Sequence, residues 1–274
     1  MSLSISTAME ILLGKITFAT YFGRITSVNR NTNWKYGITS LQRPLCHLVI
    51  SNDEFVHYYT SFDFTPRRRF SLSGAKKRNF NSIYPMISSF DGRLDDIDQH
   101  LVTAFGAYYA AMSEPKSSQS LLDYWRCLEA ATLTQDEDHS AGDPLKRARA
   151  ARRPQNIEIS DGLINRLVEK RNRLVHKAGE VMISDGDLTR LKSLSEASVW
   201  FLITEKDRYS LDEFRFFLEY GSKPENSILQ AKAAREKQIH DMNDAIEKKE
   251  VEIGRLDQII DWLEIAEEYN VPTD

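Results

Sequence analysis

The sequence contains little cysteine. Its 274 residues include two, Cys46 and Cys127, which stand far apart and in no CxxC spacing. Two isolated thiols do not make a disulfide framework, and a structural zinc site needs four closely spaced ligands. The scarcity of cysteine excludes small disulfide-rich proteins and proteins built around a structural zinc ion. It is typical of a reducing compartment, so we expect a cytoplasmic location.

Long apolar runs and phosphate-binding loops are also missing. Residues 1–23 hold a short apolar run, but Glu10 and Lys15 interrupt it and no basic segment precedes it. The pattern predicts neither a signal peptide nor a membrane span. The spacings GxGxxG and GxxxxGK[ST] do not occur, which removes the usual nucleotide-binding loops. We therefore expect no membrane contact, no cofactor and no bound metal.

Charge is nearly balanced overall but uneven along the chain. The net charge is -4, from 36 Lys and Arg against 40 Asp and Glu, and 41% of the residues are hydrophobic. Residues 1–80 carry 11 basic and 4 acidic residues, whereas residues 227–274 carry 6 and 12. The basic end could meet phosphate, although a merely solvated surface is equally compatible with such clusters.

The N-terminal part favours β structure. Residues 15–64 are rich in aromatic and β-branched side chains, in pieces such as KITFATYF, HLVIS and FVHYYTSFDF. This composition predicts strands, and hence a mixed α/β or β-rich region. The basic stretch 66–79 has no apolar period and is interpreted as an exposed loop, which places a boundary near residue 85. Residues 1–85 would form a domain that senses a trigger or binds a partner.

Helical periodicity dominates from residue 92 onward. Apolar residues recur every three or four positions in four segments, which predict helices over 95–112, 120–133, 162–179 and 187–206. With a short helix at 210–220, they predict a mainly α fold with a four-helix bundle over residues 86–222. The polar residues 134–160, basic in KRARAARR, are interpreted as a long loop.

The C-terminal residues 225–270 predict a long helix with a coiled-coil pattern. The spacing of three and four is interrupted only by Lys249 and is carried by Ile239, Met242, Ile246, Ile253, Leu256, Ile260 and Leu263. The helix would pair two copies of the chain or dock on a protein partner. The alternative is a long amphipathic helix that packs on its own domain.

The apolar stripe of the third helix contains an arginine. The stripe runs through Ile164, Leu167, Leu174 and Ala178, and Arg171 stands in the middle of it. A guanidinium on a buried stripe needs an anion, because it does not lose its charge at ordinary pH. Glu129 borders the inward face of the second helix, so we expect it to lie close to Arg171. The alternative is that both side chains reach solvent.

Asn172 and His176 share one face of this helix, four residues apart. Histidine is the side chain that most readily transfers protons near neutral pH, so His176 is a candidate acid or base. A histidine in a last helical turn is, however, more often a solvated or capping residue.

Arg171, Asn172 and His176 form the pattern R-N-x-x-x-H, which resembles the R-x(4–6)-H signature of the HEPN superfamily. The preceding helix carries W-x-x-LE at Trp125, Leu128 and Glu129 and is similar to that of the ApeA-like branch. The resemblance covers about residues 92–206. It implies a HEPN-like four-helix bundle and a metal-independent endoribonuclease, in which the RNA 2′-hydroxyl attacks the adjacent phosphate.

The resemblance also implies roles for single residues. His176 would be the acid or base, Arg171 would bind the phosphate, Asn172 would orient His176 or a phosphate oxygen, and Glu129 would support them. Such sites are built from two copies of the chain, so a homodimer is implied. The cleaved RNA would carry 2′,3′-cyclic phosphate and 5′-hydroxyl ends.

Basic residues around these helices are candidates for RNA binding. They are Lys146, Arg147, Arg149, Arg152, Arg153, Arg173 and Lys177. Contacts of this kind hold phosphate without reading sequence. A basic loop that is merely solvated is the alternative.

Two hypotheses on function follow from the sequence. The first is an endoribonuclease that serves prokaryotic antiviral defence or a toxin–antitoxin module. The second is a non-catalytic HEPN-like platform for dimerisation or nucleotide binding, which recruits a partner through its coiled coil.

Overall fold

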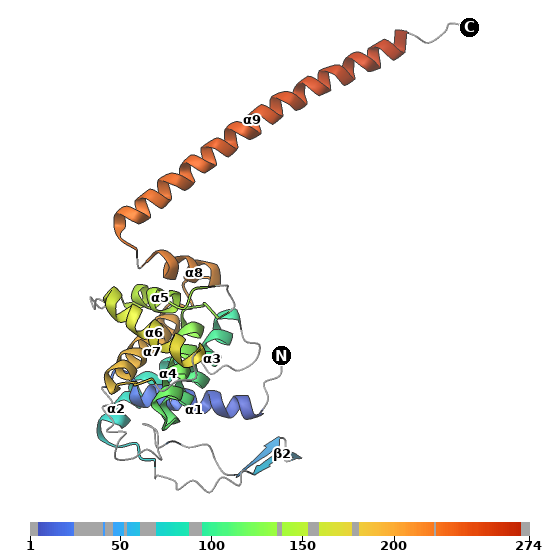
Figure 1. Cartoon of the computed structure of the whole chain (residues 1–274). Helices are drawn as coiled ribbons and strands as arrows, with labels where there is room; N and C mark the ends of the chain where they lie inside the picture. The colour runs from blue at the N-terminus through green and yellow to red at the C-terminus, as the bar shows by residue number, and fades with distance from the viewer. Residues whose placement is uncertain are drawn as a thin grey trace. The chain divides into compact units, whose positions relative to one another are not determined.

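The computed structural model describes residues 5–24, 41, 46–51, 54–60, 70–87, 95–135, 139–152, 159–176, 181–221 and 223–269. Helices dominate these residues (Figure 1). The chain divides into two compact units, Met1–Ser222 and Lys223–Asp274. The mainly α fold expected from the periodicity is confirmed.

Helix α1 (Ile5–Tyr21) corrects the expectation of a strand over residues 15–22. Its buried side chains point in several directions, so the segment lacks the single apolar face of a half-exposed helix. Phe18 is fully buried and its ring makes edge contacts with those of Phe105 and Tyr108 on α3 (Asp96–Ser113). Helix α1 therefore belongs to the helical core, and a boundary near residue 85 does not separate it from that core.

The backbones of helices α1 and α3 come very close at Gly14. A Cβ atom at this position would overlap the backbone carbonyl of Phe105. Only glycine lets the two backbones come this close, since every other residue carries a Cβ atom.

The remaining core is formed by α3, α4 (Ser117–Ala131) and α7 (Asp185–Glu205), which pack on one another. Helix α3 begins after Asp95, whose carboxylate accepts a hydrogen bond from the Asp98 amide at 2.6 Å. A capping box of Ser184 and Asp187 begins α7. Apolar side chains fill the space between these helices, among them Leu101, Met112, Leu121, Trp125, Leu128, Leu191 and Leu202. The helices expected over these segments are confirmed.

A buried polar cluster ties the end of α1 to α7. The ammonium of Lys192 donates to the backbone oxygens of Tyr21 and Arg24, at 3.0 Å each, and to the carboxylate of Glu196. Glu196 also accepts a hydrogen bond from the Tyr108 hydroxyl at 2.6 Å. Burial lowers the pKa of Lys192 and raises the pKa of Glu196. Lys192 thus joins α7 to the end of α1, because its ammonium donates to carbonyl oxygens of residues that end and follow α1.

The N-terminal region contains one described β-hairpin. Strand β1 (Cys46–Ser51) pairs antiparallel with β2 (Glu54–Thr60), with an irregularity between Val49 and Ile50. Much of the region expected to be β-rich lies outside the described residues, so its full extent stays a prediction.

Helix α2 (Gly74–Ile83) and the short 3-10 helix η2 (Tyr84–Met86) follow the hairpin and correct part of the loop expected over 66–79. The amide of Asn79 donates to the backbone oxygen of Phe22 at 2.8 Å, so α2 is attached to the end of α1.

Helix α5 (Asp143–Arg152) corrects the expectation of a long loop over 134–160. Its sequence alternates arginine with alanine, and Ala148, Ala150 and Ala151 are buried. Alanine is the best helix former and leaves room for close packing, so a basic sequence can still cover the core. Helix α8 (Leu211–Tyr220) completes the first unit and buries Phe214 and Leu218.

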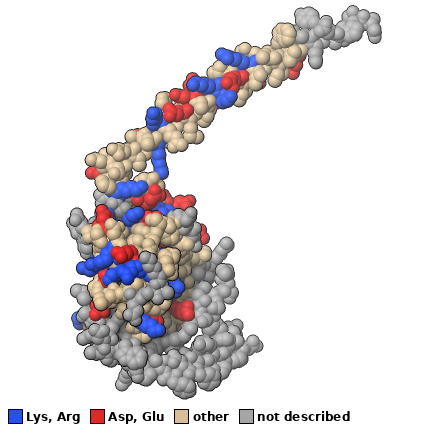
Figure 2. Space-filling model, viewed as in Figure 1, with Lys and Arg blue, Asp and Glu red and all other residues tan. Residues whose placement is uncertain are grey.

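The second unit is the single helix α9 (Glu225–Tyr269), 45 residues long. Every residue from Lys232 to Glu264 is exposed. Acidic and basic side chains occur along its length, mixed with uncharged ones (Figure 2).

Candidate functional site at the end of helix α6

The expected site residues lie on helix α6 (Asp161–His176). The hydroxyl of Ser160 accepts a hydrogen bond from the Leu163 amide at 3.3 Å and so caps the first turn. Ile164 and Leu167 are buried in this first half. Burial decreases toward the end of the helix, where His176 is exposed. The packed first half therefore fixes the helix on the core, and the polar side chains of the second half face solvent.

Helix α7 holds α6 in place through the buried carboxylate of Asp187. The ammonium of Lys170 donates to one carboxylate oxygen at 2.6 Å. Arg166 lies 3.1 Å from the other oxygen as an ion pair without hydrogen-bond geometry. Burial alone would raise the pKa of Asp187, but the hydrogen bonds from Lys170 and Ser184 outweigh it, so the pKa is lowered.

Sequence reasoning missed this contact between the two helices. Asp187 stands at the start of one predicted helix and its two cationic partners stand on another, so no local pattern connects them. The signal that could have found them is the repeat of Arg166 and Lys170, one turn apart on one face of α6.

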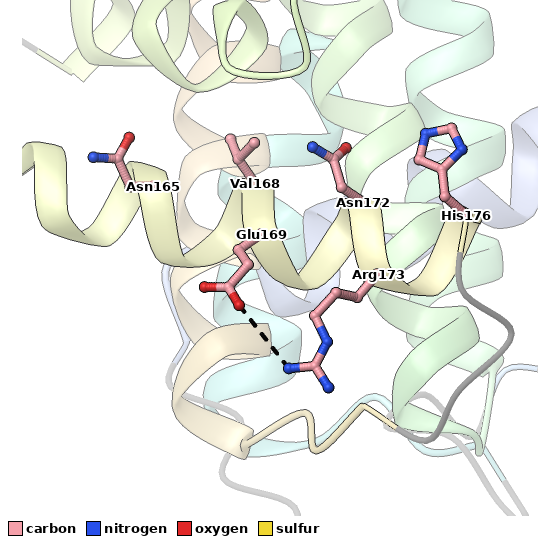
Figure 3. Close-up of a pocket in the computed structure, with 6 residues that line it drawn as sticks. All are labelled: Asn165, Val168, Glu169, Asn172, Arg173 and His176. Atoms are coloured by element: carbon pink, nitrogen blue, oxygen red, sulfur yellow. Dashed lines mark ion pairs between the residues drawn. The ribbon is translucent and has the colours of Figure 1, made fainter.

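A shallow hollow of about 440 Å³ runs along α6 (Figure 3). Val168, Asn172 and His176 point to the same side, one turn apart, and Asn165 begins the row. The lining residues Glu169 and Arg173 point to the other side, where they form an ion pair at 4.0 Å. The hollow thus brings Asn172 and His176 together on a solvent-accessible surface.

Arg171 is half-buried, and one of its guanidinium nitrogens donates to the side-chain oxygen of Asn172 at 3.2 Å. Among the described residues, no ion pair joins Arg171 to Glu129. Glu129 instead lies 3.8 Å from the imidazole of His139, which follows α4 in the chain. The guanidinium reaches the edge of the α6 surface through its long side chain, so it does not need an anion inside the bundle.

His176 has no hydrogen-bond or ion-pair partner among the residues that the structure describes, and its imidazole is exposed. The three residues Arg171, Asn172 and His176 therefore combine a permanent cation, an amide and an imidazole within two helical turns. A site of this composition can bind an anion and transfer a proton.

Most of the candidate RNA-binding residues have protein partners. Arg147 donates to the backbone oxygens of Thr132 and Leu133, at 3.2 Å each, and caps the end of α4. Arg149 pairs with Asp161 at 2.6 Å.

Arg152 is partly buried, and burial lowers its pKa. Lys146 and Arg173 are exposed and keep only surface ion pairs, with Asp143 at 3.0 Å and with Glu169. Arg153 and Lys177 lie outside the described residues. Instead of the expected basic loop, residues 143–152 form helix α5, and its arginines largely stabilise the fold.

Within the described part of the chain, no group of three His, Cys, Asp or Glu side chains is arranged to hold a metal ion. No described helix is both long enough and apolar enough to span a membrane. Comparisons with protein-family models, with curated proteins and with solved structures found no match for this chain.

Proposed function

We propose that the chain is an endoribonuclease whose site is the exposed end of α6 and is completed by a second copy. The observation that carries the proposal is the arrangement of Asn172 and His176 in one open hollow, with Arg171 hydrogen-bonded to Asn172. These are the residues that resemble the HEPN signature.

The reaction needs a proton acceptor, a proton donor and a cation. One imidazole accepts the proton of the RNA 2′-hydroxyl while the 2′-oxygen bonds to the adjacent phosphorus. The bond from phosphorus to the 5′-oxygen then breaks, and the leaving oxygen takes a proton from an acid. The guanidinium of Arg171 stabilises the negative charge that develops on the phosphate oxygens. The amide of Asn172 positions that guanidinium.

The requirement for both an acid and a base favours a site made from two chains. A single imidazole does not hold and release a proton at the same moment, so the second His176 would supply the other step. Because a two-fold axis repeats the same patch on both copies, two exposed ends of α6 provide two cations and two imidazoles.

Binding of RNA would depend on few cations. Lys146 and Arg173 are the exposed candidates, and each keeps only a surface ion pair, which costs little to exchange for phosphate. We therefore expect weak, salt-sensitive binding outside the reacting phosphate. A role in antiviral defence or in a toxin–antitoxin module remains part of this proposal.

The non-catalytic platform is the second candidate, and one observation favours it. No described residue orients the imidazole of His176, whereas a catalytic base is usually held by a further group. In this case the first unit would bind without reaction, and α9 would recruit a protein partner.

The two candidates differ in what happens to RNA. Purified protein is incubated in EDTA with end-labelled RNA and with the same sequence carrying 2′-deoxyribose throughout. The proposal predicts cleavage of the RNA to 2′,3′-cyclic phosphate and 5′-hydroxyl ends and an intact deoxy strand. Intact RNA after incubation with dimeric protein would support the platform, and cleavage of the deoxy strand would contradict 2′-hydroxyl attack.

A further inference from the structure

Helix α9 presents an apolar row that nothing in its own unit covers. The row comprises Ile239, Met242, Ile246, Ile253, Leu256, Ile260 and Leu263, each between 50% and 59% exposed. The described residues of this unit form one helix, so they offer no second element on which these side chains are buried. A helix in a protein gains most of its stability from packing its apolar face on another element, and α9 lacks such packing within its unit.

The identity of the row residues favours two parallel helices. In heptad notation the a positions are Ile239, Ile246, Ile253 and Ile260, and the d positions are Met242, Lys249, Leu256 and Leu263. Isoleucine at a with leucine at d is the combination that favours a parallel dimer over a trimer or tetramer. The row spans between three and four heptads, which is the length that such pairing requires.

We infer that α9 pairs with α9 of a second copy of this chain as a parallel, in-register two-stranded coiled coil. The inference goes beyond the proposed function, because the pairing can hold whether or not His176 cleaves RNA.

Lys249 fixes the register of the pair. It is the only charged residue at the a and d positions between 239 and 263. In register, the two Lys249 side chains share one layer, and each ammonium keeps Glu252 of its own helix as a partner at 2.6 Å. A slip of one heptad would place the two ammonium groups against Met242 and Leu256, so two layers of the apolar row rather than one would contain a charge.

Flanking charges limit the strength of the pair. In a parallel dimer the g residue Glu252 faces the e residue Asp257 of the other helix, so two pairs of like charge occur. Salt screens this repulsion. The dimer should therefore become tighter as the salt concentration rises, which is the opposite of what a heterodimer with a basic partner helix would show.

Parallel pairing has a consequence for the first units. Both chains enter α9 at Glu225, so both first units join the pair at the same end. An antiparallel pair would attach them at opposite ends of a 45-residue helix, on the order of 65 Å apart.

A disulfide cross-link tests the pairing directly. Leu256→Cys is introduced at a d position in a Cys46→Ser background, and Cys127 is kept because burial raises its pKa to about 12 and leaves it unreactive. In a parallel, in-register pair the two new thiols face each other within bonding distance. We expect a disulfide-linked dimer on a non-reducing gel.

Val251→Cys is the matched control. Val251 and Ile253 are similarly exposed, at 52% and 57%, but Val251 falls at the outward f position. The control should give no cross-link. If the Leu256→Cys chain cross-links only to an Ile246→Cys chain and not to a second Leu256→Cys chain, the pair is antiparallel and the inference is overturned. The absence of any cross-link would also overturn it.

Molar mass in solution provides the second measurement. The full chain should have twice the mass of its 31.6 kDa monomer, and Ile253→Asp should raise the dissociation constant of the α9 pair by about 100-fold or more. Val251→Asp should leave the constant nearly unchanged. Equal constants for the two variants would overturn the inference. RNA cleavage is measured separately, so failure of the pairing is distinguishable from failure of the proposed function.

Discussion

Arg171 and His176 stand five residues apart on α6 but differ in their surroundings. Arg171 is half-buried and bonded to Asn172, whereas His176 is exposed at the end of the helix. A cation that is held in place suits the binding of a phosphate, and an accessible imidazole suits proton transfer. Burial thus decreases along α6 from the phosphate-binding candidate Arg171 to the proton-transfer candidate His176.

Replacing Arg171 tests its role toward phosphate. Arg171→Gln should lower the single-turnover rate of RNA cleavage by about 10²–10³-fold, because it removes the charge that stabilises the transition state. Arg171→Lys should retain part of the rate, since it keeps the charge but loses the planar fork. The control Arg208→Gln removes an exposed arginine that pairs with Glu205, and it should leave the rate unchanged. Equal losses of cleavage rate in Arg171→Gln and Arg208→Gln would contradict the assignment of Arg171 to the phosphate.

The contact of Asp187 with Lys170 makes the stability depend on pH. The pKa of Asp187 is lowered in the folded protein, so its contribution is present above the ordinary value of about 4 and is lost as the pH falls through the folded value. Asp187→Asn should therefore reduce the free energy of unfolding at pH 7 by about 1–3 kcal/mol and by much less at pH 3. Urea unfolding at both pH values measures the difference. A deficit that is constant with pH would contradict this explanation.

The buried pair of Lys192 and Glu196 predicts a non-additive effect. Lys192→Met removes the buried cation beside the Glu196 carboxylate, whose charge is then no longer balanced although Tyr108 still donates to it, and it should cost about 3–5 kcal/mol. Adding Glu196→Gln to this variant should restore part of the loss, since the buried charge is gone. Lys206→Met, which breaks the more exposed pair with Asp98, should cost at most about 1 kcal/mol. Chemical unfolding of the unaltered chain, Lys192→Met, Glu196→Gln and the double variant gives the coupling energy.

At the scale of elements, segments with a visible apolar spacing could be predicted as helices, and segments without it could not. Helices α3 and α4 keep an exposed stripe beside their buried side, so the spacing of three and four is visible in their sequences. Helix α7 was predicted from the same spacing, although it buries every residue from Leu194 to Val199. Helix α1 is buried on several sides and rich in aromatic residues, which resembles a strand pattern. Helix α5 buries alanines between arginines, and residues this small give little apolar signal.

The same limit applies to the prediction of the candidate site from the sequence. The placement of Arg171, Asn172 and His176 near one helix end follows from the helical repeat alone. The partner of Glu129 does not, because the rotation of one helix against another depends on all the side chains between them. His139 comes from the chain beyond α4, and no local pattern connects it with Glu129.

The packing of α1 on α3 gives a test at this scale. Gly14→Ala should lower the free energy of unfolding by about 1–3 kcal/mol or more, because the new methyl group overlaps the Phe105 carbonyl. Gly106→Ala on α3 is the matched control, since no atom lies within 4 Å of the added Cβ. It should stabilise the protein by up to about 1 kcal/mol. Equal effects of the two substitutions in urea unfolding would show that α1 does not pack closely on α3.

For the whole molecule, two units with separate proposed roles are joined in one chain. The first unit, Met1–Ser222, carries the polar end of α6. The second carries the apolar row of α9, which has the pattern of a pairing helix. A site that needs two imidazoles and a helix that pairs in parallel are mutually consistent, because both require two copies of the chain joined at the same end.

The most direct test of the central claim is the rate of RNA cleavage in EDTA by His176→Ala. His240→Ala is the control, because His240 is an exposed histidine on α9 with a surface ion pair to Asp244. Circular dichroism and molar mass verify that both variants fold and pair like the unaltered chain. We predict a loss of about 10²-fold or more in the rate for His176→Ala and an unchanged rate for His240→Ala. Cleavage by His176→Ala at the rate of the unaltered chain would contradict it.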